Sequence, residues 1–348
     1  MKKSNTIGIL YFIVHLMVEI CSFYVLTSYI QSEFVWILML IYDFLAFVPQ
    51  GFFGFLRDRG IRINFAFIGT MMTSLALVMM TLSLDPFLVI LVLSVGNSIV
   101  HVQGAELTLR QSKGQMTPAA LFVAGGSFGV ITGKLLCCSG AAAPIMLGFN
   151  LLTFIPIIIA QSLSSGDETE NLEHYNFANK KLSPFIIIAL ATFVVAVRAY
   201  MGYGIPTSWN KTVIQNIILY SSMGLGKTLG GVLIDKIGIR KTALISTVGA
   251  LPFLLCGSEL MTVSLIGVTF FSMTMAVTLA LIVSVMKKYP GVAFGFTTVG
   301  LFLGTVPVFF VRIRSMLVNC IIISVLTVVC VIILTMICAK KKSDKRID

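Results

Sequence analysis

Residues 231–241 read GVLIDKIGIRK, and residues 54–62 read GFLRDRGIR. In both stretches an aspartate, Asp235 or Asp58, follows a glycine by four positions and is followed by basic residues. The two aspartates are 177 residues apart in a chain of 348 residues. A polar motif that returns after half of the chain indicates an internal repeat, so the sequence predicts two similar halves.

Two pairs of glycines are separated by nearly the same number of residues as the two aspartates. Gly125 and Gly300 are 175 residues apart, and so are Gly129 and Gly304. Both pairs lie in long apolar runs that are rich in glycine. The agreement of several pairs argues against coincidence and supports the repeat.

The composition indicates an all-α membrane protein. Hydrophobic residues make up 57% of the chain and charged residues only 11%, whereas soluble proteins carry about 25% charged residues. This balance excludes a soluble enzyme or binding module. A transmembrane helix needs roughly 20 apolar residues, and a membrane barrel would need alternating strands, which are not found. We therefore predict a polytopic protein with twelve transmembrane helices, at about residues 6–29, 34–56, 63–84, 86–109, 117–137, 141–162, 183–203, 211–234, 240–257, 260–286, 291–311 and 315–338.

The basic residues predict the orientation in the membrane. If both termini are cytoplasmic, 19 of the 25 lysines and arginines lie on the cytoplasmic side, as the positive-inside rule requires. Arg312 and Arg314 are the exception, because they fall in the last outer connection. The basic tail after Ile337 is interpreted as a topology signal that contacts membrane lipids, rather than as a nucleic-acid site. We expect a multi-pass protein of the cell membrane, with cytoplasmic N and C termini.

The longest connection divides the chain into halves. It spans residues 163–182 and contains acidic and basic residues. We expect an N-terminal six-helix bundle over residues 1–162, a cytoplasmic connecting loop, and a C-terminal six-helix bundle with a basic tail over residues 183–348. A long connection of this kind suits a protein whose two halves rock against each other.

The repeated loop resembles motif A of the major facilitator superfamily, G-x-L-x-D-[RK]-x-G-[RK]-[RK]. The second copy fits except at Ile239, and the first lacks one residue between Arg59 and Gly60. The resemblance implies two pseudo-symmetric bundles, a secondary transporter that works by alternating access, and a cytoplasmic latch that holds the outward-facing state. Glu106 is expected to join this latch through a basic loop such as that of Arg62. The predicted latch residues are Gly54, Asp58, Arg59, Arg62, Glu106, Gly231, Asp235, Lys236, Gly238 and Arg240.

A shorter stretch is similar to the fosmidomycin-resistance group of the same superfamily. Residues 98–101 read SIVH and residues 122–129 read FVAGGSFG, where that group has Phe-His-Pro-Glu and Phe-x-x-Gly-Gly-Asn-x-Gly. Val100 and Ser127 are among the departures from this pattern. The resemblance covers about forty residues and implies drug efflux.

Ionisable residues inside predicted spans are candidates for proton coupling. A charge in the membrane interior costs roughly 3 kcal/mol or more, so such residues indicate function. His15 and Glu19 are four positions apart and share one helix face, where a histidine beside a carboxylate can exchange protons near neutral pH. Asp43 lies midway along its helix without a basic residue nearby in sequence. The proton-coupling candidates are thus His15, Glu19 and Asp43, and the alternative is a structural hydrogen-bond network.

Other buried polar residues are candidates for substrate binding. Intramembrane cations with aromatic neighbours can clamp an anionic substrate, and arginine does so with two hydrogen bonds. Alternatively, these cations pair with Glu19, Asp43 and other carboxylates. The candidates are Asn97, His101, Lys134, Arg198, Tyr200 and Lys227.

These observations predict proton-coupled export of a small drug-like or anionic compound. Proton-coupled uptake of a metabolite and a non-transporting sensor or partner subunit are the alternatives. An enzyme is not expected, because no nucleophile, metal set or carboxylate pair has a convincing spacing. The seven cysteines are interpreted as packing residues. We expect no cofactor, no metal and no nucleic acid, but a small-molecule substrate, protons or another coupling ion, membrane lipids, and a monomer.

Overall fold

The computed structural model describes residues 3–164, 174–311, 313 and 315–339. Arg312, Arg314, the basic tail and most of the connecting loop lie outside these residues, so what the sequence predicts for them stays a prediction. Within the described residues the chain is helical, and its one isolated β-bridge joins Ala178 to Cys338. This confirms the predicted all-α class.

The helices follow the twelve predicted spans. In the first half they are α1 (Lys3–Ser28), α2 (Val35–Phe47), α3 (Gln50–Asp58), α4 (Phe65–Thr81), α5 (Pro86–Arg110), α6 (Thr117–Cys138), α7 (Ala143–Leu152) and α8 (Phe154–Ser164). In the second half they are α9 (Pro184–Gly204), α10 (Val213–Ile237), α11 (Ile239–Leu244), the π-helix η2 (Ile245–Gly249), α12 (Leu251–Cys256), α13 (Met261–Ser272), α14 (Thr274–Val285), α15 (Pro290–Phe310) and α16 (Met316–Ile337). Among the described residues, eleven helical segments are long and apolar enough to cross a membrane, and α4 is a shorter apolar helix.

Prolines account for most of the interruptions inside spans. A proline lacks the backbone N–H and clashes with the carbonyl group four residues earlier. Pro49 separates α2 from α3, Pro156 follows the break between α7 and α8, and Pro252 follows the π-helix η2. The break between α13 and α14 at Met273 has no proline.

The repeat in the sequence is also present in the packing of the helices. A Cβ atom on Gly125 would lie 2.4 Å from the carbonyl oxygen of Phe12, so α6 approaches the backbone of α1 closely. Gly304 would place a Cβ atom 2.1 Å from the carbonyl oxygen of Ala196, so α15 approaches α9 in the same way. The fifth span thus packs on the first as the eleventh packs on the seventh, and only glycine permits such contacts.

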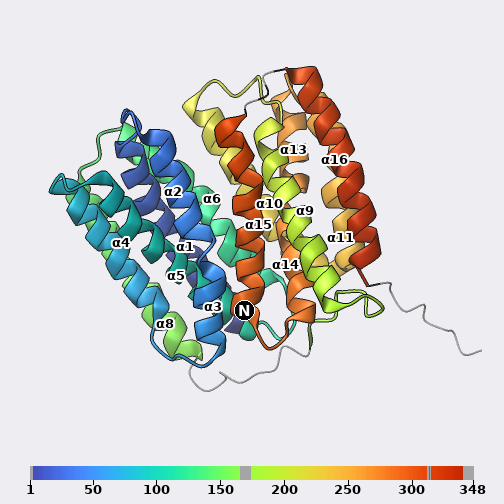
Figure 1. Cartoon of the computed structure of the whole chain (residues 1–348), viewed down its shortest axis with the longest axis horizontal. Coiled ribbons are helices and arrows are strands. Elements are labelled where there is room, and N and C mark those ends of the chain that lie inside the picture. The colour runs from blue at the N-terminus through green and yellow to red at the C-terminus, as the bar shows by residue number, and fades with distance from the viewer. Residues whose placement is uncertain (1–2, 165–173, 312, 314, 340–348) are drawn as a thin grey trace, which may run out of the picture.

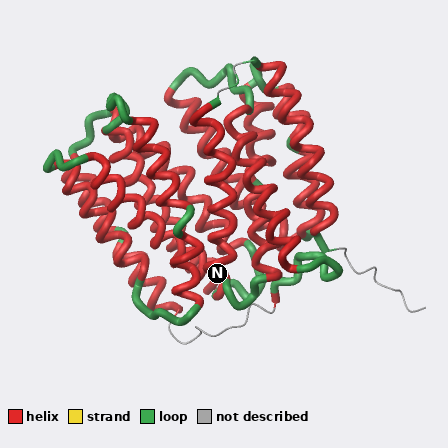
Figure 2. The backbone as a smooth tube through the Cα atoms, viewed as in Figure 1, coloured by secondary structure: helices red, strands yellow, loops and turns green. Residues whose placement is uncertain are grey.

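The buried core differs between the two ends of the molecule. Figure 1 shows α1–α8 on one side of the view and α9–α16 on the other, while Figure 2 shows the loops gathered at the two ends of the helices. One buried cluster contains residues of both halves, among them Met116, Ala120 and Phe294 near the starts of α6 and α15. Near the opposite ends, one cluster contains only residues between Cys21 and Met146, and another only residues between Trp209 and Val268. The halves therefore share a core mainly at the end where α1 begins.

Candidate functional site

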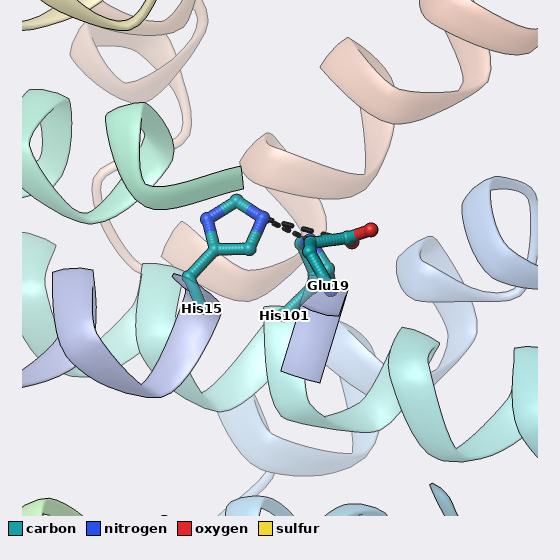
Figure 3. Close-up of side chains that lie close together, drawn as sticks. All are labelled: His15, Glu19 and His101. Carbon is teal, nitrogen blue, oxygen red and sulfur yellow. Dashed lines mark hydrogen bonds and ion pairs between the residues drawn. The ribbon is translucent and has the colours of Figure 1, made fainter. Parts of the chain in front are cut away.

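Two histidines and a glutamate meet in the first half of the chain (Figure 3). His15 and Glu19 lie one turn apart on α1, and His101 reaches them from α5. The Nε2 atoms of His15 and His101 are 2.7 Å apart. Glu19 Oε1 lies 3.4 Å from His101 Nε2 and 3.8 Å from His15 Nε2. All three residues are buried, at 6–7% exposure. We name this group the His–Glu–His cluster.

The other ring nitrogens determine what the two histidines can share. His15 Nδ1 lies 2.8 Å from the carbonyl oxygen of Phe122, and His101 Nδ1 lies 2.9 Å from that of Asn97. A carbonyl oxygen only accepts hydrogen bonds, so both Nδ1 atoms carry a proton. If both rings were neutral, two Nε2 lone pairs would face each other at 2.7 Å. One extra proton turns this contact into a hydrogen bond, and the carboxylate of Glu19 balances its charge.

The same three residues offer one ligand atom each, all within 4.8 Å of one another. Two nitrogens on a tetrahedral zinc ion, however, lie about 3.3 Å apart, since zinc–nitrogen bonds are about 2.0–2.1 Å long. The observed Nε2–Nε2 distance of 2.7 Å is that of a hydrogen bond. The geometry therefore suits a shared proton better than a metal ion.

Helix α6 and Asn97 hold the cluster in place. A Cβ atom on Gly126 would lie 2.5 Å from His15 Nε2, and one on Gly129 would lie 2.5 Å from Glu19 Cβ. The glycines of α6 thus provide the space that the cluster occupies. Asn97 Nδ2 donates to Glu19 Oε1 at 2.9 Å and to Ser22 Oγ at 3.1 Å.

Arg198 lies in the second half, buried at 6% exposure on α9. Its Nη2 atom donates to the carbonyl oxygens of Ser246 at 2.8 Å and of Phe271 at 2.9 Å. The guanidinium carbon also lies 3.5 Å from the centre of the Phe271 ring, which is a cation–π contact. Arg198 and Lys227 line one cavity.

The alternative, in which the intramembrane cations pair with carboxylates, is not found in the described part of the chain. Among the described residues, no carboxylate forms an ion pair with Lys134, Arg198 or Lys227. Lys134 instead lies over the rings of Phe23 and Tyr220, with its Nζ atom 5.4 Å and 5.6 Å from their centres.

Two other candidates lie apart from these groups. Asp43 on α2 is partly buried and has no hydrogen bond or ion pair within the described part of the chain. Tyr200 lines a separate cavity with Tyr203 and Asn319. The sequence correctly grouped His15 with Glu19, but the structure adds His101 rather than Asp43.

The two motif-A aspartates each bind a helix of the opposite half. Asp58 accepts hydrogen bonds from the backbone N–H groups of Gly291 at 3.2 Å and Val292 at 3.0 Å, in the first turn of α15. Asp235 accepts from the N–H groups of Met116 at 2.8 Å and Thr117 at 2.9 Å, where α6 begins. A carboxylate at a helix N-terminus is stabilised by the unpaired N–H groups and the helix dipole. Helices α15 and α6 are equivalent in the repeat.

The glycines of the motifs permit this contact. Gly54 and Gly291 lie so close that a Cβ atom on Gly54 would be 2.3 Å from the Gly291 carbonyl carbon. Gly231 packs in the same way on α6, where its Cβ atom would lie 2.8 Å from the carbonyl oxygen of Met116. Gly238 has a φ of 88° and ends α10.

The basic members of the latch differ from the prediction. Glu106 accepts from Arg57 Nη2 at 3.0 Å and from Arg110 Nε at 2.6 Å, whereas Arg62 is exposed and does not bind it. Helix geometry explains which arginines reach Glu106. Arg110 lies one helical turn after Glu106 on α5, and Arg57 lies in the last turn of α3, just before the loop that contains Arg62. Arg110 also binds Asp58 at 3.2 Å.

The remaining basic residues of motif A do not take part in this network. Arg59 lies over the Phe55 ring at 4.9 Å. Lys236 and Arg240 form no ion pair with any carboxylate that the structure describes. Sequence reasoning missed Arg57 and Arg110, although the spacing of Arg110 from Glu106 was a usable signal.

Comparisons with known proteins agree with this architecture. The sequence matches no protein-family model and no curated protein. Its structure is similar to a crystal structure of FucP, a major facilitator superfamily transporter, in the outward conformation, with a TM-score of 0.63, 14% identity, and coverage of 95% of this chain and 97% of that one. A structure of the E. coli fucose:proton symporter FucP gives a TM-score of 0.63 at 13% identity, with 95% and 97% coverage. The chain therefore has the fold of these transporters, as its loop motifs predict.

Proposed function

We propose that this chain, which has the fold of major facilitator superfamily transporters, is a proton-coupled secondary transporter of a small molecule. The observation that carries the proposal is the His–Glu–His cluster. Its two Nε2 atoms, 2.7 Å apart, need one extra proton, and both Nδ1 atoms are fixed by carbonyl groups. A buried group that gains and loses a single proton is what coupling to a proton gradient requires.

Alternating access is the proposed mechanism. We propose that residues 1–162 and 183–348 form two six-helix bundles that move against each other. The shared core and the two aspartate contacts favour closure at the end where α1 begins. The separate clusters at the other end leave that end free to open, which supports an outward-facing state.

Loss of the shared proton gives a physical reason for a conformational change. With the proton present, one imidazolium and the Glu19 carboxylate cancel in charge. Without it, two Nε2 lone pairs and a carboxylate face one another within 4 Å, which is repulsive. The contacts of α1 with α5 and α6 are therefore expected to depend on protonation.

The direction of transport rests on resemblance. Similarity to the fosmidomycin-resistance group favours export of a drug-like or anionic compound, in exchange for protons. Uptake is the second candidate, and it is favoured by the similarity to the fucose:proton symporter. We further propose a monomer in the cell membrane with cytoplasmic termini, surrounded by lipids.

Transport in vesicles of known orientation tests the proposal. The purified protein is first screened with small anions, cations and neutral drugs for thermal stabilisation, since a bound ligand raises stability. Compounds that stabilise it are then used in flux assays with a pH gradient imposed in either direction. We expect flux to follow the gradient in the wild type and to lose this dependence in Glu19→Gln.

His174→Gln is the matched control, because His174 is the only histidine outside the cluster. It should retain gradient-driven flux. Undiminished coupling in all three of Glu19→Gln, His15→Gln and His101→Gln would contradict a role of the cluster in proton coupling. Coupling that disappears only in Asp43→Asn would assign this role to Asp43 instead.

A further inference from the structure

The guanidinium of Arg198 is only partly satisfied in this state. Its Nη2 atom has two carbonyl partners, but Nε and Nη1 are buried and have no hydrogen-bond partner within the described residues. An arginine cannot give up its charge in a protein. A buried cation with free donors and no carboxylate beside it is costly in a membrane, so such a group indicates a site where an anion can bind.

The carbonyl groups that hold Arg198 come from two breaks in the helices. Ser246 lies in the π-helix η2, and Phe271 is two residues before the break at Met273. Helical carbonyl groups are normally used within their own helix, and an interruption frees them to bind a side chain. In transporters, helix interruptions near the middle of the membrane surround substrate sites. Both helix interruptions therefore supply hydrogen-bond acceptors to the same buried cation, Arg198.

Arg198 borders a cavity of about 180 Å³ that a second cation also lines. Lys227 contributes to it from α10, and no carboxylate is among the residues around it. The remaining lining is mainly apolar, with Val195, Met275 and Leu301 among it. A cavity of about 150 Å³ holds benzene, so this one has room for a benzene-sized body with an acidic group.

We propose that this cavity binds a small organic anion, a carboxylate on an apolar body of about the size of benzene. Arg198 and Lys227 bind the carboxylate, and the apolar lining contacts the body. Because Nε and Nη1 are covered in this state, the guanidinium turns slightly toward the cavity on binding and gains the partners that it lacks. The proposal rests on the proposed function, since it identifies the class of compound that is transported.

Lys227 connects this cavity with the first half of the chain. It also borders a small space lined by Ala120 and Val123 of α6 and by Phe294 of α15. Phe122, whose carbonyl oxygen holds His15, lies in the same stretch of α6, and its ring centre is 6.0 Å from that of Phe294. An anion beside Lys227 is therefore next to the contact between the halves, where it can affect their movement.

Binding of benzoate, with benzamide as its neutral analogue, tests the proposal on the purified full-length protein. Radiolabelled benzoate is measured at equilibrium, together with the thermal stability of the protein. We expect benzoate to bind and to raise the melting temperature, and benzamide to do neither. Arg198→Lys keeps the charge but loses the planar guanidinium group with its parallel N–H donors. We expect it to weaken benzoate binding at least about tenfold, as for the loss of one hydrogen bond between charged groups. Lys227→Gln should weaken it to a similar degree.

Lys211→Gln is the control, since it removes an exposed cation of the same half of the chain that does not line the cavity. It should bind benzoate as the wild type does. Equal effects of benzoate and benzamide, no benzoate binding, or unchanged binding in both Arg198→Lys and Lys227→Gln would overturn the proposal.

The two proposals fail in different ways. Benzoate binding that needs Arg198, but with no flux under any pH gradient, would contradict the transport function and leave the anion site in place. Gradient-driven flux of a neutral compound that is unaffected by Arg198→Lys would contradict the anion site and leave the transport function in place.

Discussion

His15 and His101 face each other through Nε2 at 2.7 Å, although each ring already donates from Nδ1 to a backbone carbonyl oxygen. Because neither ring can turn its protonated nitrogen inward without losing that bond, the pair is held ready for one proton. The nearby carboxylate of Glu19 then sets the charge of the whole cluster to zero when the proton is bound.

Replacement of His15 by glutamine is expected to separate transport from the pH gradient. The amide can still donate toward the Phe122 carbonyl group, but it cannot share a proton with His101. We expect the flux of this variant in a pH gradient to be no higher than its flux without a gradient. The free energy of unfolding should fall by about 1–3 kcal/mol, as for a buried polar partner that is removed. Flux assays and thermal unfolding measure the two effects.

Helix α6 supplies a second way to disturb the cluster without touching its members. In Gly126→Ala the new Cβ atom would lie 2.5 Å from His15 Nε2, so the ring or the helix must shift. We expect a loss of about 1–3 kcal/mol of stability, as for overpacked cores, and a loss of proton coupling. Gly148→Ala is the control, since nothing lies within 4 Å of that position, and a stability loss of the same size there would argue against the close contact.

The sequence predicted the fold well, because its signals are repeated along the whole chain. Apolar runs of spanning length and the paired motifs around Asp58 and Asp235 are properties of residue type and spacing alone. They predicted the helices, and the structure adds which helix each aspartate binds. Even the glycine pairs, which carry no charge, have equivalent contacts in both halves.

The site was less predictable, since it depends on contacts between distant segments. His15 and Glu19 were grouped through helix spacing, but His101 is 86 positions from His15, and no local pattern indicates that they meet. The partners of Arg198 are backbone carbonyl groups, which every residue has. Only the helix breaks at η2 and Met273 expose them, and of these only the first has a proline as its signal.

The two motif-A aspartates are expected to hold the outward-facing state. Asp58→Asn keeps the size of the side chain but weakens its interaction with the N–H groups of Gly291 and Val292. We expect the equilibrium to shift toward the inward-facing state by about 0.5–2 kcal/mol for each aspartate replaced. The reactivity of a cysteine introduced at Tyr203, which is 60% exposed, toward a membrane-impermeant thiol reagent measures the shift in a background without native cysteines.

A shift toward the inward-facing state closes the outer end, so Asp58→Asn should lower the reactivity of the cysteine at position 203. Asp235→Asn should also lower it, and the double variant should lower it more strongly. Glu259→Gln removes a carboxylate outside the latch and is the control. An increase in reactivity in both aspartate variants would mean that these contacts do not stabilise closure at the end where α1 begins.

Tyr175 joins the connecting loop to the first half and gives a pH-dependent prediction. It is fully buried, its hydroxyl group contacts Ser112 Oγ, and it donates to the Leu109 carbonyl oxygen at 3.1 Å. Burial raises the pKa of Tyr175 above its usual value near 10. The folded state therefore holds this proton more tightly than the unfolded state, so its stabilising effect is fully present below pH 10 and is lost as the pH rises further.

Tyr175→Phe removes both the hydrogen bond and the titration. We expect it to lower the free energy of unfolding by about 1 kcal/mol at pH 8, the net worth of a hydrogen bond. Above pH 10 the wild type loses stability that the variant cannot lose, so the difference between the two should shrink as the pH rises. Thermal unfolding of both proteins at pH 8 and at pH 11 measures it. A constant difference between the wild type and Tyr175→Phe would mean that the hydroxyl group of Tyr175 is not protected by burial.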